Sequence, residues 1–265
     1  MAEPLKLNYG KDAVSVYRTD DAGNLFAAQV ALVLHGEVFL PSYIEGDNSM
    51  VVATDSMKNF IHSCGCDFGG ASLEEFLAYV GRCFLERYDH VERLTIEGRE
   101  LPFVRRGEAL YQEVRSDYGT ARIELAREGV VDHRSGRGRL HLVKLTGSSF
   151  AGFVKDEYTT LPDAVDRPLF VYLDVHWRHA DFERRVTSED VRDLVTATFD
   201  DFVSASIQHL LHEMGTRALE RFPEIETIEL DGQNRLWDTA RSHDQVTVYT
   251  DARPPYGVIH LTLAR

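Results

Sequence analysis

Histidine and cysteine are the residues of this sequence with the most evident capacity to bind a metal. His62, Cys64 and Cys66 lie close together, but structural zinc sites use two separated ligand pairs and no second pair stands at a suitable spacing. The order of His209, His212 and the neighbouring glutamate does not match that of zinc-protease helices. The glycine-rich stretches lack the lysine and the hydroxyl residue of a phosphate-binding loop. We therefore predict neither a metal site nor a nucleotide site.

Four other regions place polar side chains where a strand or helix boundary alone does not require them. They are residues 9–12, residues 46–59, residues 149–167, and the pair 206–208 and 232–238. Taken singly, their residues have ordinary structural explanations. Thr54 and Asp55 would be helix caps, Arg167 and Gln208 surface residues, and Phe150 part of a core. These explanations account for each residue but not for their combination.

Hydrophobic periodicity predicts the strands and helices that must position these regions. In the first half we expect strands at residues 13–18, 26–35, 91–101 and 120–127, and helices behind Thr54 and Asp55 and behind Ser72, where Glu75 completes a capping box. In the second half we expect strands at residues 140–146, 169–179, 224–230, 245–250 and 257–263, and helices behind Thr187, reaching Phe202, and behind Ser204. Each half is thus α+β, with its helices on one face of an antiparallel sheet.

An internal repeat supports a duplicated module. The segment at residues 85–92 recurs in altered form at residues 219–226, about half a chain length later. We therefore predict two modules of two strands, two helices and two strands, residues 1–135 and 136–265, with the polar, glycine-rich stretch 132–137 as the junction. Open four-stranded sheets leave unpaired edges, so we also expect the chain to form oligomers.

Composition and charge exclude several classes of protein. The 265 residues include 29 Lys and Arg against 43 Asp and Glu, a net charge of −14, which makes nucleic acid an unfavourable partner. No apolar run approaches the roughly 20 residues of a membrane span, and the N-terminus shows no leader. Three cysteines fit reduced thiols better than a disulfide framework. We expect a cytoplasmic protein with no membrane partner.

Taken together, the four regions resemble the family of urate oxidase (uricase), and above all its bacterial members. The likeness runs from Tyr9-Gly10-Lys11 to Pro254-Pro255-Tyr256-Gly257, and its most specific blocks surround Thr54 and run from Phe150 to Arg167. The resemblance implies the tunnelling fold, in which two antiparallel ββααββ modules per chain assemble into a β-barrel homotetramer. It also implies oxidation of urate by O2 and water, without a cofactor, to 5-hydroxyisourate and hydrogen peroxide during purine degradation.

The same resemblance assigns roles to individual residues. Lys11 and Thr54 would form the catalytic relay that removes a proton from urate, because a lysine amine acts as a base where burial disfavours its charged form. Arg167 would supply a compensating charge, Gln208 a donor and an acceptor, and Phe150 a stacking surface. The implied substrate-binding set is Thr54, Asp55, Phe150, Arg167, Ile207, Gln208 and Asn234.

In this family the active sites lie between subunits. The resemblance therefore implies that one chain supplies Lys11, Thr54 and Asp55, and that its neighbour supplies Phe150, Arg167, Ile207, Gln208 and Asn234. Thr54, Asp55 and Ile207 stand at predicted helix starts, where free backbone N–H groups favour an anion. Asn234 would hold oxygen or a water molecule over the substrate ring.

One position departs from the family pattern. In eukaryotic members a histidine follows the asparagine by two residues and completes a Lys-Thr-His triad, whereas this chain has Leu236 there. Leucine carries no proton, so we expect the relay to run through Lys11, Thr54 and water. Whether His243 or His260 takes the place of that histidine in space stays open.

Two other functions remain to be weighed against the enzyme. A catalytically silent urate- or purine-binding protein of the same fold would keep Phe150, Arg167 and Gln208 and would tolerate Leu236. A pterin-type enzyme of the same architecture, such as a cyclohydrolase, would need a metal or another base cluster, and the His and Cys residues provide no convincing set. Urate oxidation is the function that the resemblance favours.

Overall fold

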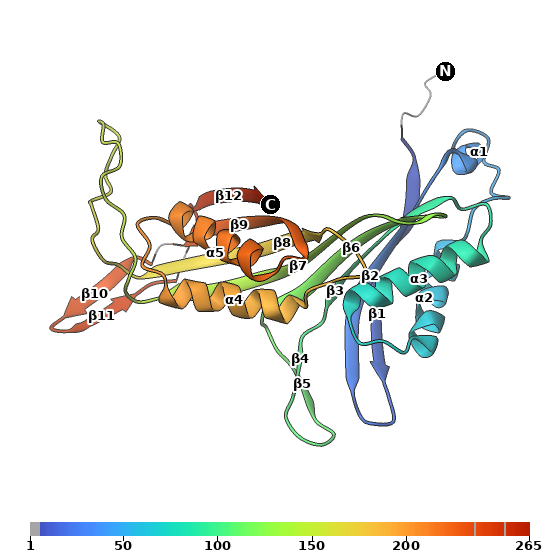
Figure 1. The fold of residues 1–265 in the computed structure, drawn as a ribbon, viewed down its shortest axis with the longest axis horizontal. Coiled ribbons are helices and arrows are strands. Elements are labelled where there is room, and N and C mark those ends of the chain that lie inside the picture. The colour runs from blue at the N-terminus through green and yellow to red at the C-terminus, as the bar shows by residue number, and fades with distance from the viewer. Residues whose placement is uncertain (1–5, 236, 252) are drawn as a thin grey trace. The chain divides into compact units, whose positions relative to one another are not determined.

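The computed structural model describes residues 6–235, 237–251 and 253–265. Contacts between residues divide the chain into two compact units, unit 1 (Met1–Ser135) and unit 2 (Gly136–Arg265). Each unit combines an antiparallel sheet with two long helices that pack on one face of it (Figure 1). The α+β class predicted from the sequence is confirmed.

Unit 1 consists of a sheet in the order β1-β2-β3-β6-β7, with its helices between β2 and β3. Its strands are β1 (Asn8–Thr19), β2 (Leu25–His35), β3 (Arg93–Glu100), β6 (Tyr118–Ala126) and the first part of β7 (Gly129–Lys144), with a small hairpin of β4 (Phe103–Arg105) and β5 (Tyr111–Glu113). Its helices are η1 (Glu37–Phe39), α1 (Leu40–Ile44), α2 (Thr54–Asp67) and α3 (Leu73–Arg87). All the strand pairs formed by β1, β2, β3 and β6 are antiparallel.

Unit 2 repeats this order of elements with a sheet that runs β7-β8-β9-β12. Its strands are the second part of β7, β8 (Leu169–His179), β9 (Ile225–Arg235) and β12 (Gly257–Ala264), with a hairpin of β10 (Thr239–His243) and β11 (Val246–Tyr249). Its helices are α4 (Ser188–Asp201) and α5 (Ile207–Arg221). The described chain therefore contains five α-helices in all, three in unit 1 and two in unit 2.

The core of unit 2 follows from the alternation along β8. Val171, Leu173, Val175 and Trp177 occupy alternate positions, so their side chains share one face of the strand. All four are buried, and they belong to one cluster with apolar residues of α4 and α5 such as Leu211. The face of the sheet that carries these residues is thus the face that the helices cover.

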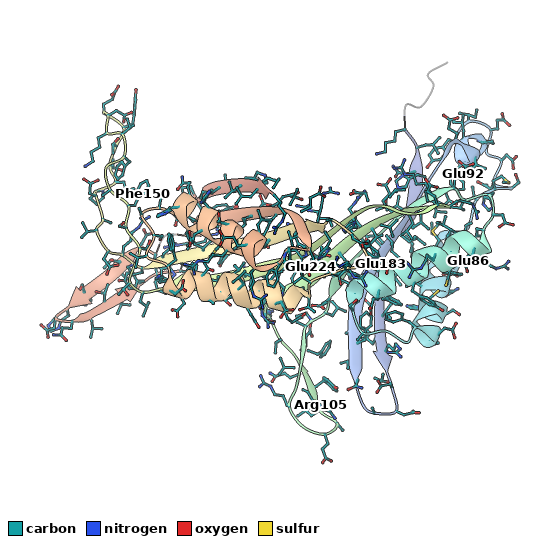
Figure 2. All side chains as sticks on the ribbon, in the orientation of Figure 1. Glu86, Glu92, Arg105, Phe150, Glu183 and Glu224 are labelled. Carbon is teal, nitrogen blue, oxygen red and sulfur yellow. The ribbon has the colours of Figure 1, made fainter. Side chains whose placement is uncertain are left out.

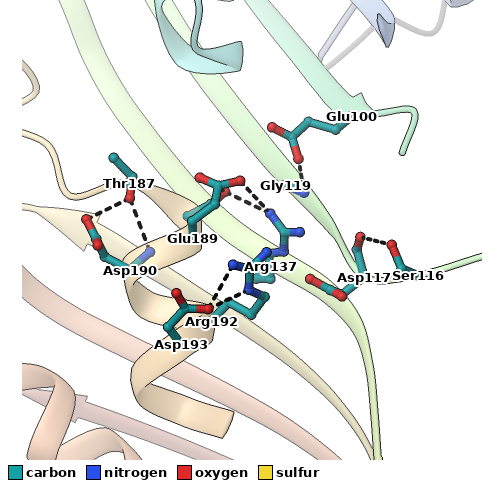
Figure 3. Close-up of polar contacts among 11 residues, drawn as sticks. Glu100, Ser116, Asp117, Gly119, Arg137, Thr187, Glu189, Asp190, Arg192 and Asp193 are labelled. Carbon is teal, nitrogen blue, oxygen red and sulfur yellow. Dashed lines mark hydrogen bonds and ion pairs between the residues drawn. The ribbon is translucent and has the colours of Figure 1, made fainter. Parts of the chain in front are cut away.

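The starts of the long helices are fixed by side-chain caps in three of the four cases. Ser72 and Glu75 form the predicted capping box at the start of α3. Thr187 caps α4 by accepting a hydrogen bond from Asp190 N–H at 3.1 Å (Figure 3). Beside this cap, Arg137 lies buried and donates from Nη1 to Glu189 at 3.0 Å. The first turns of α3 and α4 are thereby held in place.

Three sequence-based expectations about element boundaries were wrong. The N-cap of α2 is Ala53, so Thr54 and Asp55 are its first helical residues instead of caps. The N-cap of α5 is Ser206 and not Ser204. Phe202 is the residue after α4 and does not belong to the helix. The polar stretch 132–137 contains the boundary between the two units, after Ser135, and lies within strand β7.

The long helices also bear on whether the chain has a membrane span. No helix within the described residues combines the length and the hydropathy that crossing a bilayer requires. Helices α3 and α5 each have one apolar face, which packs on the sheet of its own unit, and one polar face on the opposite side.

The capping box of α3 provides a test of local stability. We expect Ser72→Ala to lower the free energy of unfolding by about 1 kcal/mol, because the N–H of Glu75 loses its acceptor at the helix start. Denaturant unfolding followed by circular dichroism measures this change. Ser63→Ala, at an exposed site within α2, is the matched control and should leave stability unchanged or slightly raised. Equal stability of the two variants would show that the cap contributes nothing.

Candidate active site

Lys11 lies in β1 beside an irregularity that directs its side chain. The pairing of β1 with β2 places Lys11 opposite Leu32, and the register then shifts between Lys11 and Val14. Ala13 has a φ of 58°, and its N–H donates to the Asp12 carboxylate at 2.6 Å. Bulges of this kind turn the strand locally and change the direction of the neighbouring side chains. The half-buried Lys11 is therefore held by a defined turn of the backbone.

Gly10 precedes Lys11 because the two strands come too close there for any side chain. A Cβ atom at this position would lie 2.0 Å from the carbonyl oxygen of Leu32. Real Cβ atoms do not approach backbone that closely, so any other residue would push β1 away from β2. The glycine of the Tyr9-Gly10-Lys11 segment thus has a packing reason.

Thr54 and Asp55 form the exposed first turn of α2. No side chain caps this helix start, so its first N–H groups are available to a ligand or to water. The segment that leads into the helix is tied to β1, because Val52 N–H donates to the phenol oxygen of Tyr9 at 2.8 Å. The structure therefore brings the start of α2 to the part of β1 that carries Lys11.

The electrostatics of Asp55 show that Lys11 lies close to it. The pKa of the Asp55 carboxyl is lowered first by its hydrogen bond from Lys58 at 2.6 Å, then by the charge of Lys58, and also by Asn59 and by the charge of Lys11. Lys11 and the first turn of α2 are thus neighbours within unit 1. Of the eight residues predicted for the site, the structure gathers Lys11, Thr54 and Asp55 into this first group.

Phe150 and Arg167 lie at the base of the long loop between β7 and β8. This loop projects from the helices and sheet of unit 2, and Phe150 lies on it (Figure 2). Phe150 pairs with Ala164 through two backbone hydrogen bonds of 2.8 and 2.9 Å, and Arg167 N–H donates to Ser148 at 2.9 Å. Ser148 in turn bridges to Ser204, just ahead of α5. The backbone therefore fixes Phe150 and Arg167 relative to the start of α5.

Arg167 is a half-buried cation that forms no ion pair with the described residues of unit 2. Burial lowers the pKa of its guanidinium, and its Nε is buried without a hydrogen-bond partner among the described residues. The guanidinium carbon lies 5.5 Å from the centre of the Phe150 ring. A desolvated charge of this kind attracts an anion more strongly than a solvated one.

The ring of Phe150 already has a stacked neighbour, which the sequence analysis missed. Phe153 lies parallel to it, with ring centres 4.8 Å apart and planes 11° apart. One face of the Phe150 ring is therefore covered by Phe153. No pattern in the sequence distinguished Phe153 from the other apolar residues of the loop.

Ile207 and Gln208 are the first two residues of α5. Ser206 caps this helix by accepting a hydrogen bond from His209 N–H at 3.1 Å, which leaves the N–H groups of Ile207 and Gln208 without a partner inside the helix. The Ile207 side chain is buried in the core, whereas Gln208 is exposed. Ile207 can thus contact a ligand only through its backbone.

Asn234 lies near the end of β9, between Val171 of β8 and Gly257 of β12. It shares a face of the strand with Gly232. A Cβ atom at Gly232 would lie 3.6 Å from the Ile207 side chain, so this face is turned toward α5. Its side chain is thus on the helix-covered side of the sheet, and its Oδ1 is buried without a hydrogen-bond partner among the described residues. Phe150, Arg167, Ile207, Gln208 and Asn234 form the second group, in unit 2.

Leu236, which stands where eukaryotic members of the family carry a histidine, lies outside the described residues. His260 pairs in register with Asp231 and contacts its carboxylate at 2.6 Å, on the face of the sheet opposite Asn234. His243 is exposed in the β10–β11 hairpin, next to Asp244. The side chain of His260 thus lies on the side of the sheet away from Asn234.

The described residues also show how the potential metal ligands are distributed. No three His, Cys, Asp or Glu side chains in this part of the chain form a group that could hold a metal ion. The thiols of Cys64, Cys66 and Cys83 are all free. The chemistry available to the two groups of residues is therefore anion binding, hydrogen bonding, stacking and proton transfer.

Comparison with solved structures defines the class of fold to which this arrangement belongs. A crystal structure of urate oxidase from Bacillus sp. TB-90 matches the chain with a TM-score of 0.90 and 36% sequence identity. The match covers 98% of this chain and 100% of that one. The fold is therefore of the urate oxidase type.

Sequence comparison gives the family. The family model described as Uricase matches residues 7–108 and 133–260. A uricase of Halalkalicoccus jeotgali is 39% identical over 275 residues, which cover 89% of this chain and 90% of that protein. The chain belongs to the uricase family.

A third relative is longer than this chain. The uric acid degradation bifunctional protein of Bacillus sp. strain TB-90 is 39% identical over 259 residues, which cover 88% of this chain but 52% of that protein. The chain thus spans about half the length of this relative.

The neighbourhood of Asp55 leads to a measurable prediction. We expect Lys58→Met to raise the pKa of Asp55 toward its ordinary value, because the variant removes the largest cause of the lowered pKa. Lys11→Met should raise it by a smaller amount, since the charge of Lys11 is a lesser cause of the lowered pKa than Lys58. Carboxyl-carbon NMR titration measures both shifts. If the pKa of Asp55 does not change in Lys11→Met, Lys11 does not lie near the first turn of α2.

Proposed function

We propose that the chain oxidises urate with O2 and water to 5-hydroxyisourate and hydrogen peroxide, without a cofactor, as a step of purine degradation. The observation that carries this proposal is the half-buried guanidinium of Arg167 beside the Phe150 ring, whose Nε finds no hydrogen-bond partner among the described residues. A flat organic anion satisfies both groups at once, because the ring stacks while the charge is neutralised. Membership of the uricase family supports urate as that anion.

The residues of unit 2 would bind the substrate. Arg167 would present its fork of donors to urate oxygens, and Gln208 would offer both an amide N–H and a carbonyl oxygen to the pyrimidine edge. The Ile207 N–H at the start of α5 would add a donor that favours negative charge. Asn234, with its buried and unpartnered Oδ1, would hold O2 or water over the ring.

The residues of unit 1 would supply the base. Lys11 would take a proton from the urate monoanion through the Thr54 hydroxyl, and the backbone N–H groups of Thr54 and Asp55 would face the anion. The resulting dianion is rich enough in electrons to transfer two of them to O2. Water then adds to the oxidised ring, which gives 5-hydroxyisourate, and the reduced oxygen leaves as hydrogen peroxide. All electrons thus come from urate.

The complete site would form between subunits. We propose that units 1 and 2 are the two tunnelling-fold modules, residues 1–135 and 136–265, and that four chains build a β-barrel homotetramer. Lys11, Thr54 and Asp55 of one chain would then face Arg167 and its neighbours in another. Each of the strands β1 and β12 has one neighbouring strand in the described chain, and such open edges favour pairing with another subunit. A cytoplasmic location belongs to the same proposal, since free thiols suit a reducing compartment.

The test is an oxygen-electrode assay with urate on purified protein after exhaustive chelation. The proposed reaction consumes O2, produces an equal amount of hydrogen peroxide and removes the ultraviolet band of urate. Saturable urate binding without O2 uptake would instead identify a silent binding protein. Activity that is lost on chelation and restored by a metal would contradict the cofactor-free reaction.

Two substitutions should separate binding from proton transfer. We expect Arg167→Ala to raise KM for urate by roughly 10- to 100-fold, because a hydrogen-bonded charge pair is lost. Lys11→Met should leave KM nearly unchanged and lower kcat by roughly 100-fold or more, because it removes the base. Steady-state kinetics measure both parameters. The matched controls Arg241→Ala and Lys6→Met remove exposed cations outside the proposed site and should behave like wild type. An unchanged kcat in Lys11→Met would exclude this lysine from the relay.

Mixed oligomers test whether the site lies between chains. A 1:1 mixture of Lys11→Met and Arg167→Ala chains, co-expressed so that oligomers form at random, should regain about one quarter of wild-type activity, because that share of the interfaces holds both intact residues. The control mixture of Lys11→Met with Thr54→Ala should regain nothing, since both residues come from one chain. A site formed within a single chain would give no recovery in either mixture.

A further inference from the structure

Tyr9 is the residue of the Tyr9-Gly10-Lys11 segment to which neither substrate binding nor proton transfer gives a role. Its phenol oxygen nevertheless accepts a hydrogen bond of 2.8 Å from Val52 N–H. Val52 is buried and stands two residues ahead of Thr54, in the segment that leads into α2. Within the described part of unit 1, Tyr9 is thus the only residue of β1 whose side chain forms a hydrogen bond with this segment.

The phenol oxygen has a fixed position because the ring is packed. The Tyr9 ring stands edge-to-face against Phe39, with centres 4.9 Å apart, and Phe39 is fully buried. The backbone of Tyr9 pairs with Leu34 in β2. Burial also raises the pKa of the Tyr9 phenol, so the group stays neutral at physiological pH. The Tyr9 phenol oxygen is therefore a hydrogen-bond acceptor at a fixed position, and it fixes the position of the Val52 N–H.

The bond between Tyr9 and Val52 lies two residues ahead of Lys11 in one segment and two residues ahead of Thr54 in the other. Tyr9 and Lys11 are two positions apart on β1, ahead of the bulge, so their side chains leave the strand on the same side. Val52 and Thr54 are also two positions apart. The bond between Tyr9 and Val52 therefore holds the backbone ahead of Thr54 near the backbone ahead of Lys11, in agreement with the effect of the Lys11 charge on Asp55.

We propose that Tyr9 is a positioning residue for the reaction: its hydrogen bond to Val52 sets the Thr54 hydroxyl within reach of the Lys11 amine. This inference rests on the proposed function, because it assigns Tyr9 to the relay of that reaction. Proton transfer requires hydrogen-bond distances, and a displacement of about 1 Å in such a pair lowers rates by as much as about 100-fold. A hydroxyl that fixes one partner relative to the other thus controls the rate without touching the substrate.

A purely structural bond and a positioning bond differ in their kinetic effect. Loss of a structural bond lowers stability but leaves the folded enzyme with its normal kcat. Loss of a positioning bond lowers the kcat of the folded enzyme far more than it changes KM, because Phe150, Arg167 and Gln208 of unit 2, which would bind the substrate, are untouched. The kcat and KM of a folded variant therefore decide between the two roles.

The experiment compares Tyr9→Phe with Tyr43→Phe in the full-length chain. Tyr9→Phe keeps the ring on Phe39 and removes only the hydroxyl. Tyr43→Phe is the matched control, since it removes a neighbouring hydroxyl whose hydrogen bond, of 2.9 Å, goes to the carbonyl of Asn8 instead of the α2 segment. We expect Tyr9→Phe to lower kcat about 10- to 100-fold with KM within about twofold of wild type, and Tyr43→Phe to keep wild-type kinetics. The Val52 amide should exchange faster with deuterium in Tyr9→Phe alone.

The other outcomes would overturn the inference in distinguishable ways. A folded Tyr9→Phe enzyme with wild-type kcat would remove Tyr9 from the relay and leave the proposed function intact. A wild-type chain that consumes no O2 with urate would overturn the proposed function itself, and the role of Tyr9 with it. If Tyr9→Phe does not fold, Val52→Pro removes the same bond from the donor side. Failure of both variants to fold would make the bond a requirement of folding and would exclude the positioning role.

Discussion

The unpaired charge of Arg167 is the constraint on which the arrangement of unit 2 depends. A half-buried guanidinium without a carboxylate costs free energy unless an anion joins it, and no carboxylate of the described unit 2 does so. The surrounding backbone is accordingly fixed: Arg167 N–H binds Ser148, Ser148 bridges to Ser204, and α5 begins directly beyond. The loop and the helix start are thus held around a charge that is kept available for a ligand.

Unit 1 contributes groups that a binding site alone would not need. Lys11 follows a glycine that no other residue can replace, precedes a bulge, and lies near the exposed first turn of α2. Binding of an anion requires cations and N–H donors, but removal of a proton requires a base held at a set distance from a hydroxyl. Under the proposed function, unit 1 would hold the base and unit 2 would bind the substrate.

Periodicity predicted most of the framework, because long alternating strands leave a clear signal. The segment 169–179 coincides with β8, and the capping box of Ser72 and Glu75 marks the start of α3. Thr54 and Ser204 were assigned wrongly as caps, since hydroxyl residues cluster at both helix starts and sequence alone does not say which of them the backbone meets. The bond between Tyr9 and Val52 left no signal, because its acceptor and donor are far apart in sequence and the donor is backbone. The site residues came from resemblance, and spacing alone would not have selected them.

Under the proposed function, the net charge of −14 opposes binding of the anionic substrate, whereas the local donors of the site favour it, and these two forces act over different distances. At physiological salt the Debye length is about 8 Å, so carboxylates spread over the surface are largely screened from a ligand in the site. The guanidinium of Arg167 and the N–H groups at the start of α5 act at hydrogen-bond distance, where screening is weak. These local donors would therefore make the binding of an anion favourable despite the negative net charge. The same reasoning explains why Asp55, although acidic, is compatible with an anion site: its carboxylate is bound by Lys58, and its backbone N–H remains at the positive end of α2.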